Sequence, residues 1–209
     1  DPVRAQRELA AGGWFDDDGD GRPENAAGEP FPVVDLLYNT NSSRHADIAI
    51  VLGGMWQRTL GVEVALRGKD SQYFKEDLKS GNFMVGRGSW YGDYGDPTTF
   101  LDIFRADNGN NDRGYSNPRI DAMLDDAADE RDPATRLAKL AAVERVLFTD
   151  EVPMLTICQL VQLYMYDPTA VRGISRHPRL VQYLWELEHR APEPTGPGPK
   201  PTDDHTQMN

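Results

Sequence analysis

The fold is decided by residues 31–90, which read FPVVDLLYNTNSSRHADIAIVLGGMWQRTLGVEVALRGKDSQYFKEDLKSGNFMVGRGSW. Three runs in this stretch have strand character: FPVVDLLY at 31–38, the alternating VEVALR at 62–67, and FMVGRGSW at 83–90. The two intervals between them carry helical patterns. The order strand, helix, strand, helix, strand predicts an α/β fold, a sheet with crossover helices.

Capping residues bound the helices on both sides of this stretch. A side chain that accepts hydrogen bonds stands before each helical pattern, and glycine follows several of them. Proline takes the first helical position after Asp1, Asp96, Asn117 and Asp132. The expected helices are Arg4–Ala11, Ser42 or Ser43 to Leu60 before Gly61, Asp70–Lys79 before Gly81, Thr98–Phe104, Arg119–Asp129 and Ala134–Thr149.

The residues after the last helix are less regular. Two apolar segments, Val152–Cys158 and Leu160–Tyr166, have strand character, and a short element is expected at Leu180–Leu187. Ala191–Asn209 contains five prolines and almost no apolar residue, so we expect a flexible tail. With no initiator methionine and no signal-peptide pattern, the start of the chain resembles a cut end.

Composition excludes several classes of protein. The 209 residues include 22 Lys and Arg against 34 Asp and Glu, a formal charge of −12, which disfavours binding to nucleic acid or anionic membrane. No apolar run approaches the ~18 residues of a membrane span, so we expect no membrane insertion by this chain. A single cysteine, Cys158, excludes a disulfide framework and a cysteine-based zinc site.

The segment from Arg87 to Leu101, RGSWYGDYGDPTTFL, is the strongest candidate for a binding site. Its residues 87–97 join three aromatic rings, an arginine and two aspartates at the end of a predicted strand, where α/β sheets bind ligands. The rings Trp90, Tyr91 and Tyr94 offer flat apolar surface, while Asp93 and Arg87 suit the ammonium and carboxylate of a zwitterion. A structural alternative is that Trp90 is a core residue and Asp96 is a helix cap.

The acidic loop from Asp16 to Asn25 matches the first half of a calcium loop. Asp16, Asp18 and Asp20 alternate, and Gly21 stands at the sharp turn. The bidentate glutamate of such loops is replaced by Ala27. The loop is therefore either a calcium site or an ordinary connection rich in turn-forming residues.

Signatures of catalysis are missing from the sequence. The four histidines are scattered, and neither H-E-x-x-H nor G-x-S-x-G occurs. We therefore expect a protein that is not an enzyme and has no cofactor other than the calcium considered above. A hydrolase using Asp93 and Asp96 is the third hypothesis, and the sequence does not constrain the separation of these two carboxylates.

Four stretches of the sequence resemble one family of transport proteins. SWYGDYGDPTTFLDIF and NNDRGYSNPRIDAMLDDA are similar to the C-terminal lobe of oligopeptide- and dipeptide-binding proteins of ABC importers. AQRELAAGGWFDDDGDG near the start and VPMLTICQLVQLYMYDPTAVRGI near the end resemble the same family. The resemblance implies a type II periplasmic-binding-protein-like fold, with residues 1–160 as the C-terminal solute-binding lobe. It makes 161–190 a segment returning to an N-terminal lobe, and 191–209 the tail.

The resemblance also implies roles for single residues. In the family an acid three positions after the tryptophan holds the peptide's α-ammonium, which corresponds to Asp93 after Trp90. In some members an arginine three positions before the tryptophan meets the carboxylate, which corresponds to Arg87. The implied function is that of an importer's substrate-binding component, with a peptide or related small solute and the permease's transmembrane subunits as partners. Its implied location is periplasmic, or the extracellular face of the cytoplasmic membrane.

Two main hypotheses for the function of the chain therefore remain. The first is peptide capture for an ABC importer. The alternative is a surface domain that calcium stabilises through the Asp16–Asp20 loop. We also expect the last elements to expose apolar faces that favour self-association.

Overall fold

The chain forms two compact units that are described separately. The computed structural model describes residues 1–161, 163–176 and 181–190. The first unit comprises residues 1–90 and 100–155, and the second comprises 91–99 and the residues from 156 onward. The predicted tail at 191–209 lies outside the described residues. The elements are α1 (Pro2–Ala11), β1 (Val34–Asn39), α2 (Ser43–Leu60), β2 (Val64–Lys69), α3 (Ser71–Ser80), β3 (Val85–Gly86), α4 (Thr98–Leu101), η1 (Asp102–Phe104), α5 (Pro118–Asp129), α6 (Pro133–Arg145), η2 (Val146–Glu151), β4 (Val171–Arg172), η3 (Leu184–Glu186) and β5 (Glu188–His189).

The predicted parallel sheet is confirmed in the first unit. Its three strands run in the order β2-β1-β3, and β1 pairs in parallel with both neighbours. β1 is the central strand, and its Leu36 and Leu37 are fully buried. Such continuous burial is typical of a strand covered on both faces.

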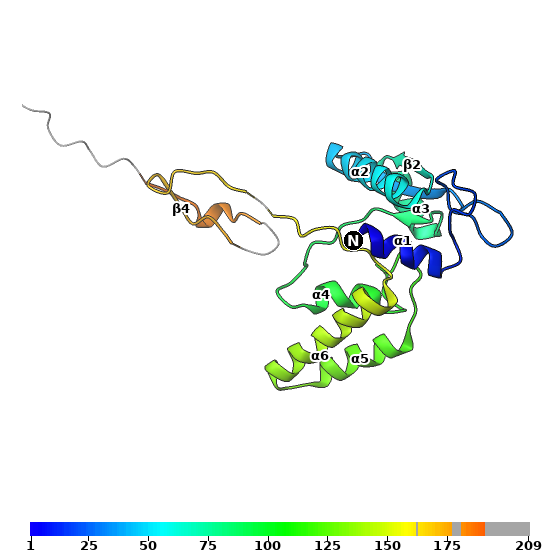
Figure 1. Ribbon diagram of the computed structural model, residues 1–209. Coiled ribbons are helices and arrows are strands. Elements are labelled where there is room, and N and C mark those ends of the chain that lie inside the picture. Colours follow the sequence, from blue (N-terminus) through cyan, green and yellow to red (C-terminus); the bar gives the residue numbers. More distant parts are fainter. Residues whose placement is uncertain (162, 177–180, 191–209) are drawn as a thin grey trace, which may run out of the picture. The chain divides into compact units, whose positions relative to one another are not determined.

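Helices α2 and α3 cover opposite faces of this sheet (Figure 1). The Val64 and Leu66 side chains approach Gly53 of α2 so closely that a Cβ there would touch both. Arg67 and Lys69, one and three positions after Leu66, instead pair with Asp77 of α3. Because side chains alternate along a strand, the two helices must lie on different faces.

The helix boundaries agree with the capping predictions. The side chains of Asp1, Asp70, Asn117 and Asp132 each accept a backbone N–H of the first turn. The glycines after α2 and α3 adopt the left-handed conformation. Ser42 takes the cap position of α2 without a side-chain bond. α1 begins two residues earlier than predicted, at Pro2.

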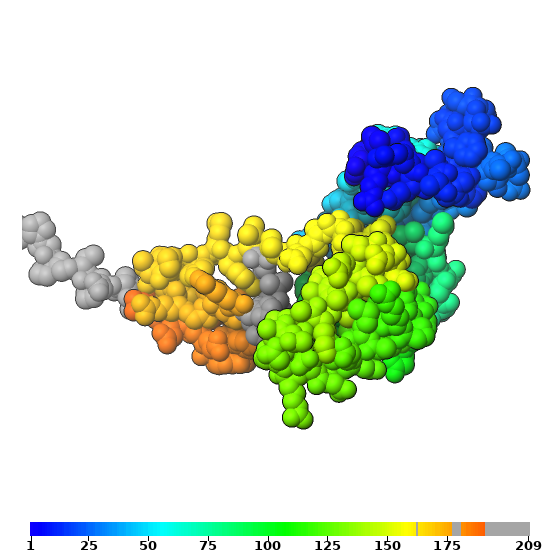
Figure 2. Space-filling view, turned by 60° about the horizontal axis from the view of Figure 1, so that its bottom comes forward, coloured from blue at the N-terminus to red at the C-terminus, as the bar shows by residue number. Residues whose placement is uncertain are grey.

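A second hydrophobic core lies among the helices that follow the sheet. α5 and α6 lie side by side (Figures 1 and 2), and η2, a π-helix, continues α6. The helix predicted to reach Thr149 therefore changes its winding after Arg145. The buried side chains of this core are Leu101, Ile103, Phe104, Ile120, Leu124, Ala127, Leu140, Val143, Val146 and Leu147.

Two strand predictions were wrong. Val152–Cys158 and the described residues of Leu160–Tyr166 form no strand. Most of their apolar side chains are exposed, 89 % for Leu163 and 100 % for Met165, while Met154 packs against the helical core. β-branched and aromatic composition makes a strand only where a neighbouring strand takes up the backbone hydrogen bonds.

The third strand is shorter than predicted. Only Val85 and Gly86 pair with β1. Glycines at 86 and 88 supply no side chain to pack on the sheet, which weakens a strand. The element expected at Leu180–Leu187 is the 3₁₀ turn η3 followed by β5, which pairs with β4 in the second unit.

Candidate functional site

Arg87 lies where strand β3 leaves the sheet. Its backbone N–H donates to the carbonyl of Leu37, at 2.8 Å. The side chain is half-buried. The carboxyl end of β1 thus fixes the start of the predicted ligand-binding segment, at the edge where α/β sheets bind ligands.

Trp90 joins the same segment to the helical core. The ring is half-buried and packs against the cluster formed by α5, α6 and their neighbours. Its indole nitrogen is buried and has no hydrogen-bond partner among the described residues. A buried indole N–H normally finds a partner, so Trp90 is a core residue that keeps one unused donor.

Tyr91, Asp93 and Tyr94 belong to the second unit. All three are exposed, Tyr91 at 52 % and Tyr94 at 48 %. The Asp93 backbone N–H donates to Thr99 Oγ1 at 2.9 Å, and the hydroxyl oxygens of Tyr94 and Thr98 lie within hydrogen-bond distance, at 3.2 Å. Two threonines of α4 therefore hold the turn that presents these side chains.

Asp96 has the role of a helix cap. Its Oδ1 accepts the backbone N–H of Thr98 at 3.0 Å and the Thr98 hydroxyl at 2.8 Å. The structural alternative for Asp96 is therefore confirmed. The five predicted ligand-binding residues fall into two groups, Arg87 and Trp90 in the first unit and Tyr91, Asp93 and Tyr94 in the second.

Sequence reasoning missed a charged network on the α3 face of the sheet. Arg67 of β2 donates to both carboxylate oxygens of Asp35, at 2.9 and 2.5 Å, and to Asp77 at 2.8 Å. Lys69 reaches the same oxygen of Asp77 at 2.6 Å. No local spacing joins positions 35, 67 and 77. Only strand register reveals the network, because Arg67 pairs with Leu37, two residues after Asp35.

These contacts shift the pKa values of the acids. The hydrogen bond from Arg67 lowers the pKa of Asp35 from its ordinary value. Hydrogen bonds from Lys69 and Asn82, together with the charge of Arg67, lower the pKa of Asp77. Both carboxylates are therefore ionised partners of fixed cations.

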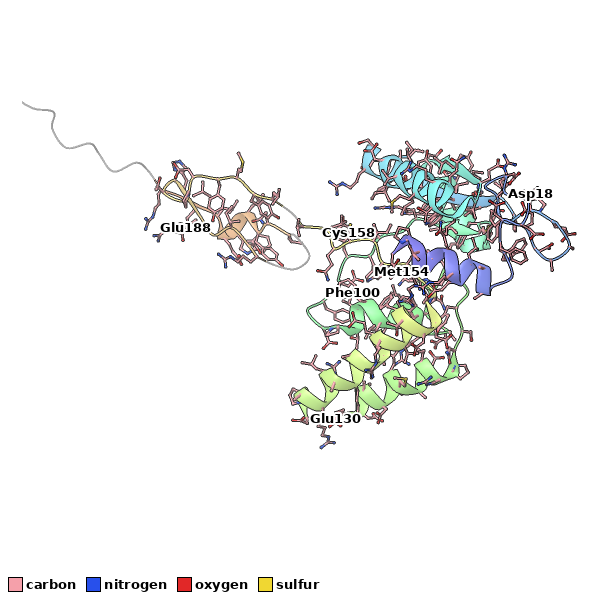
Figure 3. The ribbon with its side chains drawn as sticks, viewed as in Figure 1. Asp18, Phe100, Glu130, Met154, Cys158 and Glu188 are labelled. Carbon is pink, nitrogen blue, oxygen red and sulfur yellow. The ribbon has the colours of Figure 1, made fainter. Side chains whose placement is uncertain are left out.

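The acidic loop closes as a small antiparallel ladder (Figure 3, where Asp18 is labelled). Phe15 and Glu24 exchange two backbone hydrogen bonds of 3.0 Å. This pairing brings the carboxylates of Asp16, Asp18 and Glu24 together, with oxygens within 4.8 Å of one another. Asp20 lies outside this group. Its Oδ1 accepts the backbone N–H of Arg22 at 2.8 Å.

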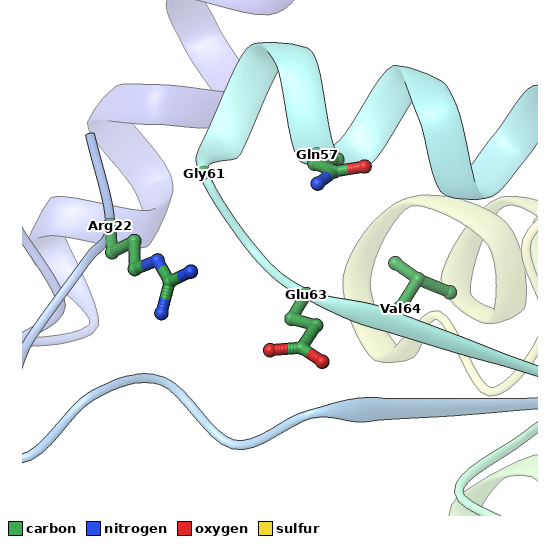
Figure 4. Close-up of a pocket in the computed structure, with 5 residues that line it drawn as sticks. All are labelled: Arg22, Gln57, Gly61, Glu63 and Val64. Carbon is green, nitrogen blue, oxygen red and sulfur yellow. The ribbon is translucent and has the colours of Figure 1, made fainter.

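A pocket of about 410 Å³ lies where α2 ends and β2 begins. Arg22 and Glu63 direct their charged groups toward the same space (Figure 4). Gln57, Gly61 and Val64 complete the lining. None of the predicted ligand-binding residues lines this pocket.

Comparison with known proteins identifies the family. Residues 1–112 match the model of the bacterial extracellular solute-binding proteins, family 5 Middle. The oligopeptide-binding protein OppA of Bacillus subtilis strain 168 is 37 % identical over 143 residues, 68 % of this chain and 25 % of that protein. The periplasmic murein peptide-binding protein MppA of Escherichia coli K12 is 37 % identical over 133 residues, 64 % of this chain and 24 % of that protein.

Solved structures agree. The Escherichia coli murein tripeptide binding protein MppA superposes with a TM-score of 0.64 at 32 % identity, covering 73 % of this chain and 27 % of that one. Haemophilus influenzae OppA in complex with the peptide RPPGFSPFR gives a TM-score of 0.59 at 26 % identity, covering 70 % and 26 %. This chain spans about a quarter of the length of these relatives. The predicted type II periplasmic-binding-protein fold is confirmed, while the boundaries at residues 160 and 190 stay predictions.

The relatives are named as binding proteins, several of them periplasmic, which confirms the expected location outside the cytoplasm. Among the described helices, none has the length and apolarity of a membrane span. The family match includes the whole segment from Arg87 to Leu101. The chain belongs to the bacterial extracellular solute-binding proteins of family 5.

Proposed function

We propose that this chain is part of the substrate-binding component of an ABC importer, which captures peptides and delivers them to the permease's transmembrane subunits. The observation that carries the proposal is that the family match, over residues 1–112, includes the aromatic and acidic segment at 87–101. Relatives named for oligopeptide, dipeptide and murein peptide binding supply the ligand class.

The residue types of the segment suit capture of a zwitterion. Asp93 is an exposed acid in a turn whose backbone is already fixed by Thr99. Trp90 is half-buried, and its buried indole N–H has no partner among the described residues. Arg87 leaves the sheet just ahead of them. We assign the peptide ammonium to Asp93, its carboxylate to Arg87, and stacking surface to Trp90, Tyr91 and Tyr94.

The proposed activity is binding without chemical change. The peptide would be held through its charged ends and released intact to the permease. A hydrolase based on Asp93 and Asp96 is disfavoured because Asp96 is occupied as a cap of the Thr98 turn.

Isothermal titration with tripeptides tests the role of Asp93. We expect Asp93→Asn to weaken binding about tenfold or more, since it removes a charge-assisted hydrogen bond of about 1.5–3 kcal/mol. Asp96→Asn is the matched control from the same segment. Asparagine also caps helices, so affinity should stay unchanged. Equal affinities of wild type and Asp93→Asn would reject the ammonium role.

A second candidate, stabilisation by calcium, has one observation in its favour. The oxygens of Asp16, Asp18 and Glu24 lie close enough to share one cation. The two carboxylate oxygens of Asp16 also accept the N–H groups of Gly19 and Gly21, at 2.7 and 2.9 Å. These backbone N–H groups of the loop are therefore hydrogen-bonded without calcium. Calcium would bind to the carboxylate oxygens in addition to these hydrogen bonds.

A further inference from the structure

We propose that Arg67 is a positioning residue that anchors the start of the segment 82–90 and thereby sets the places of Arg87 and Trp90. The importance for ligand binding rests on the proposed function. The anchoring itself does not, because it follows from contacts within the first unit.

Arg67 reaches across the sheet. It lies on the edge strand β2, while segment 82–90 enters the opposite edge strand β3 and β1 runs between them. The guanidinium spans this distance over the side chain of Asp35, which it meets through two hydrogen bonds. Its Nη2 also donates to the backbone carbonyl of Asn82 at 2.6 Å. One side chain of β2 therefore holds the residue from which the segment begins.

Asp77 of α3 binds both Arg67 and Asn82, on the face of the sheet that α3 covers. It accepts from Arg67 on Oδ2 and from the Asn82 side-chain amide on Oδ1, at 2.8 and 2.9 Å. Asn82 is thus bound through its carbonyl by Arg67 of β2, and through its side chain and its backbone N–H by Asp77 of α3. The Asp77 side chain is only 9 % exposed, so this acceptor is shielded from solvent.

After Asn82 the backbone of the segment is bound mainly to residues of β1, beginning with a hydrogen bond between Met84 and the Asp35 side chain. Strand β3 pairs with β1 through Val85 and Gly86 only, followed by the single bond from Arg87 N–H to Leu37. The glycine at 88 has nothing within 4 Å of where a Cβ would stand. Loss of Arg67 removes the bond to the Asn82 carbonyl and the cation that binds Asp35, so the segment that follows Asn82 is held less firmly.

Lysine cannot replace Arg67 in this role. The guanidinium uses a planar fork to bind Asp35 in two places while also reaching Asp77 and Asn82. A lysine ammonium is a compact point charge with three donors and cannot span these partners. Arg67→Lys therefore keeps the charge and removes the anchor.

The test compares the 209-residue wild-type chain with the variants Arg67→Gln and Arg67→Lys and with a matched control variant. Arg105 is the control because it also forms two ion pairs, with Asp102 at 3.1 Å and with Asp125 at 2.8 Å. These pairs lie among the helices and involve no strand of the sheet. Three quantities are measured: hydrogen exchange at the Arg87 amide, affinity for a set of tripeptides with free ends, and the free energy of unfolding.

We expect both Arg67 variants to speed exchange at the Arg87 amide about tenfold and to weaken tripeptide binding about tenfold. Arg105→Gln should lower the free energy of unfolding and leave exchange at Arg87 and affinity as in wild type. This contrast separates positioning from a general loss of stability.

Two results overturn the inference. Unchanged exchange at Arg87 in Arg67→Gln refutes the anchor, whether or not any peptide binds. Faster exchange with unaltered affinity refutes the effect on the ligand site. A wild-type chain that binds none of the tripeptides contradicts the proposed function alone, and the exchange measurement then still decides the anchor.

Discussion

Gly61, at the end of α2, lies directly against the backbone carbonyl of Gly21 in the acidic loop. A Cβ at position 61 would overlap that oxygen and also lie 3.2 Å from Pro23. The residue adopts φ of 70°, the left-handed conformation that ends the helix. Glycine is thus required here by backbone conformation and by the close approach of another chain segment.

Gly81 provides the comparison that separates these two requirements. It ends α3 with φ of 69° and has nothing within 4 Å of its would-be Cβ. We expect Gly81→Ala to cost about 1–2 kcal/mol of unfolding free energy from conformation alone. Gly61→Ala should cost about 1–3 kcal/mol more because a backbone atom must move. Urea unfolding measures both, and equal costs would contradict the contact with Gly21.

The network around Arg67 predicts a pH dependence of stability. Asp35 and Asp77 have pKa values below the ordinary ~3.9 of aspartate, lowered by their cationic partners. Their contribution to stability is therefore present above pH ~4 and lost as the pH falls through the lowered values. We expect the free energy of unfolding of wild type to fall more steeply below pH 4 than that of Arg67→Gln. Parallel curves for the two proteins would show that these pairs contribute nothing.

Calcium binding can be tested on the residues that the structure groups. Calcium at about ten times its dissociation constant would stabilise the fold by about 1.4 kcal/mol and raise the melting temperature by about 3–6 °C. Glu24→Gln should remove this shift, while Asp20→Asn should keep it, because Asp20 lies outside the carboxylate group. No shift with wild type rejects calcium. A shift that survives Glu24→Gln and disappears in Asp20→Asn would instead favour the ligand set expected from sequence.

The second unit should make the chain associate with itself. Val161, Leu163 and Met165 are 80, 89 and 100 % exposed. Apolar side chains gathered in one stretch of surface favour association. We expect sedimentation velocity to show association of the wild-type chain that increases with concentration. The triple variant V161S/L163S/M165S should abolish this association. The control L137S, at a half-exposed leucine on α6, should leave it unchanged. A wild-type chain that stays monomeric across concentrations would contradict this expectation.

The sequence predicted those parts of the fold that depend on local signals. Aspartate or asparagine at positions 1, 70, 117 and 132 supplies the first-turn bonds of four helices, and these bonds depend only on neighbouring residues. Strand order followed from the alternation of strands and helices. The strands predicted within residues 152–166 were wrong, because amino-acid composition does not show whether a partner strand is present.

Contacts between distant residues were beyond sequence reasoning. The contacts of Arg67 with Asp35 and Asn82 depend on the register of β1 against β2, which the sequence does not give. Glu24 joins Asp16 and Asp18 because Phe15 and Glu24 pair across the loop. That pairing was the missed signal, since a turn-rich loop between Phe15 and Glu24 brings its two ends together.

The central claim is that Asp93 receives the free amino terminus of a peptide. Titrating wild type and Asp93→Asn with one tripeptide and its N-acetylated form gives a double-mutant cycle for this contact. We predict that acetylation weakens binding to wild type about tenfold or more and leaves binding to Asp93→Asn nearly unchanged. An equal loss on acetylation in both proteins would contradict the claim, because the ammonium would then be recognised elsewhere.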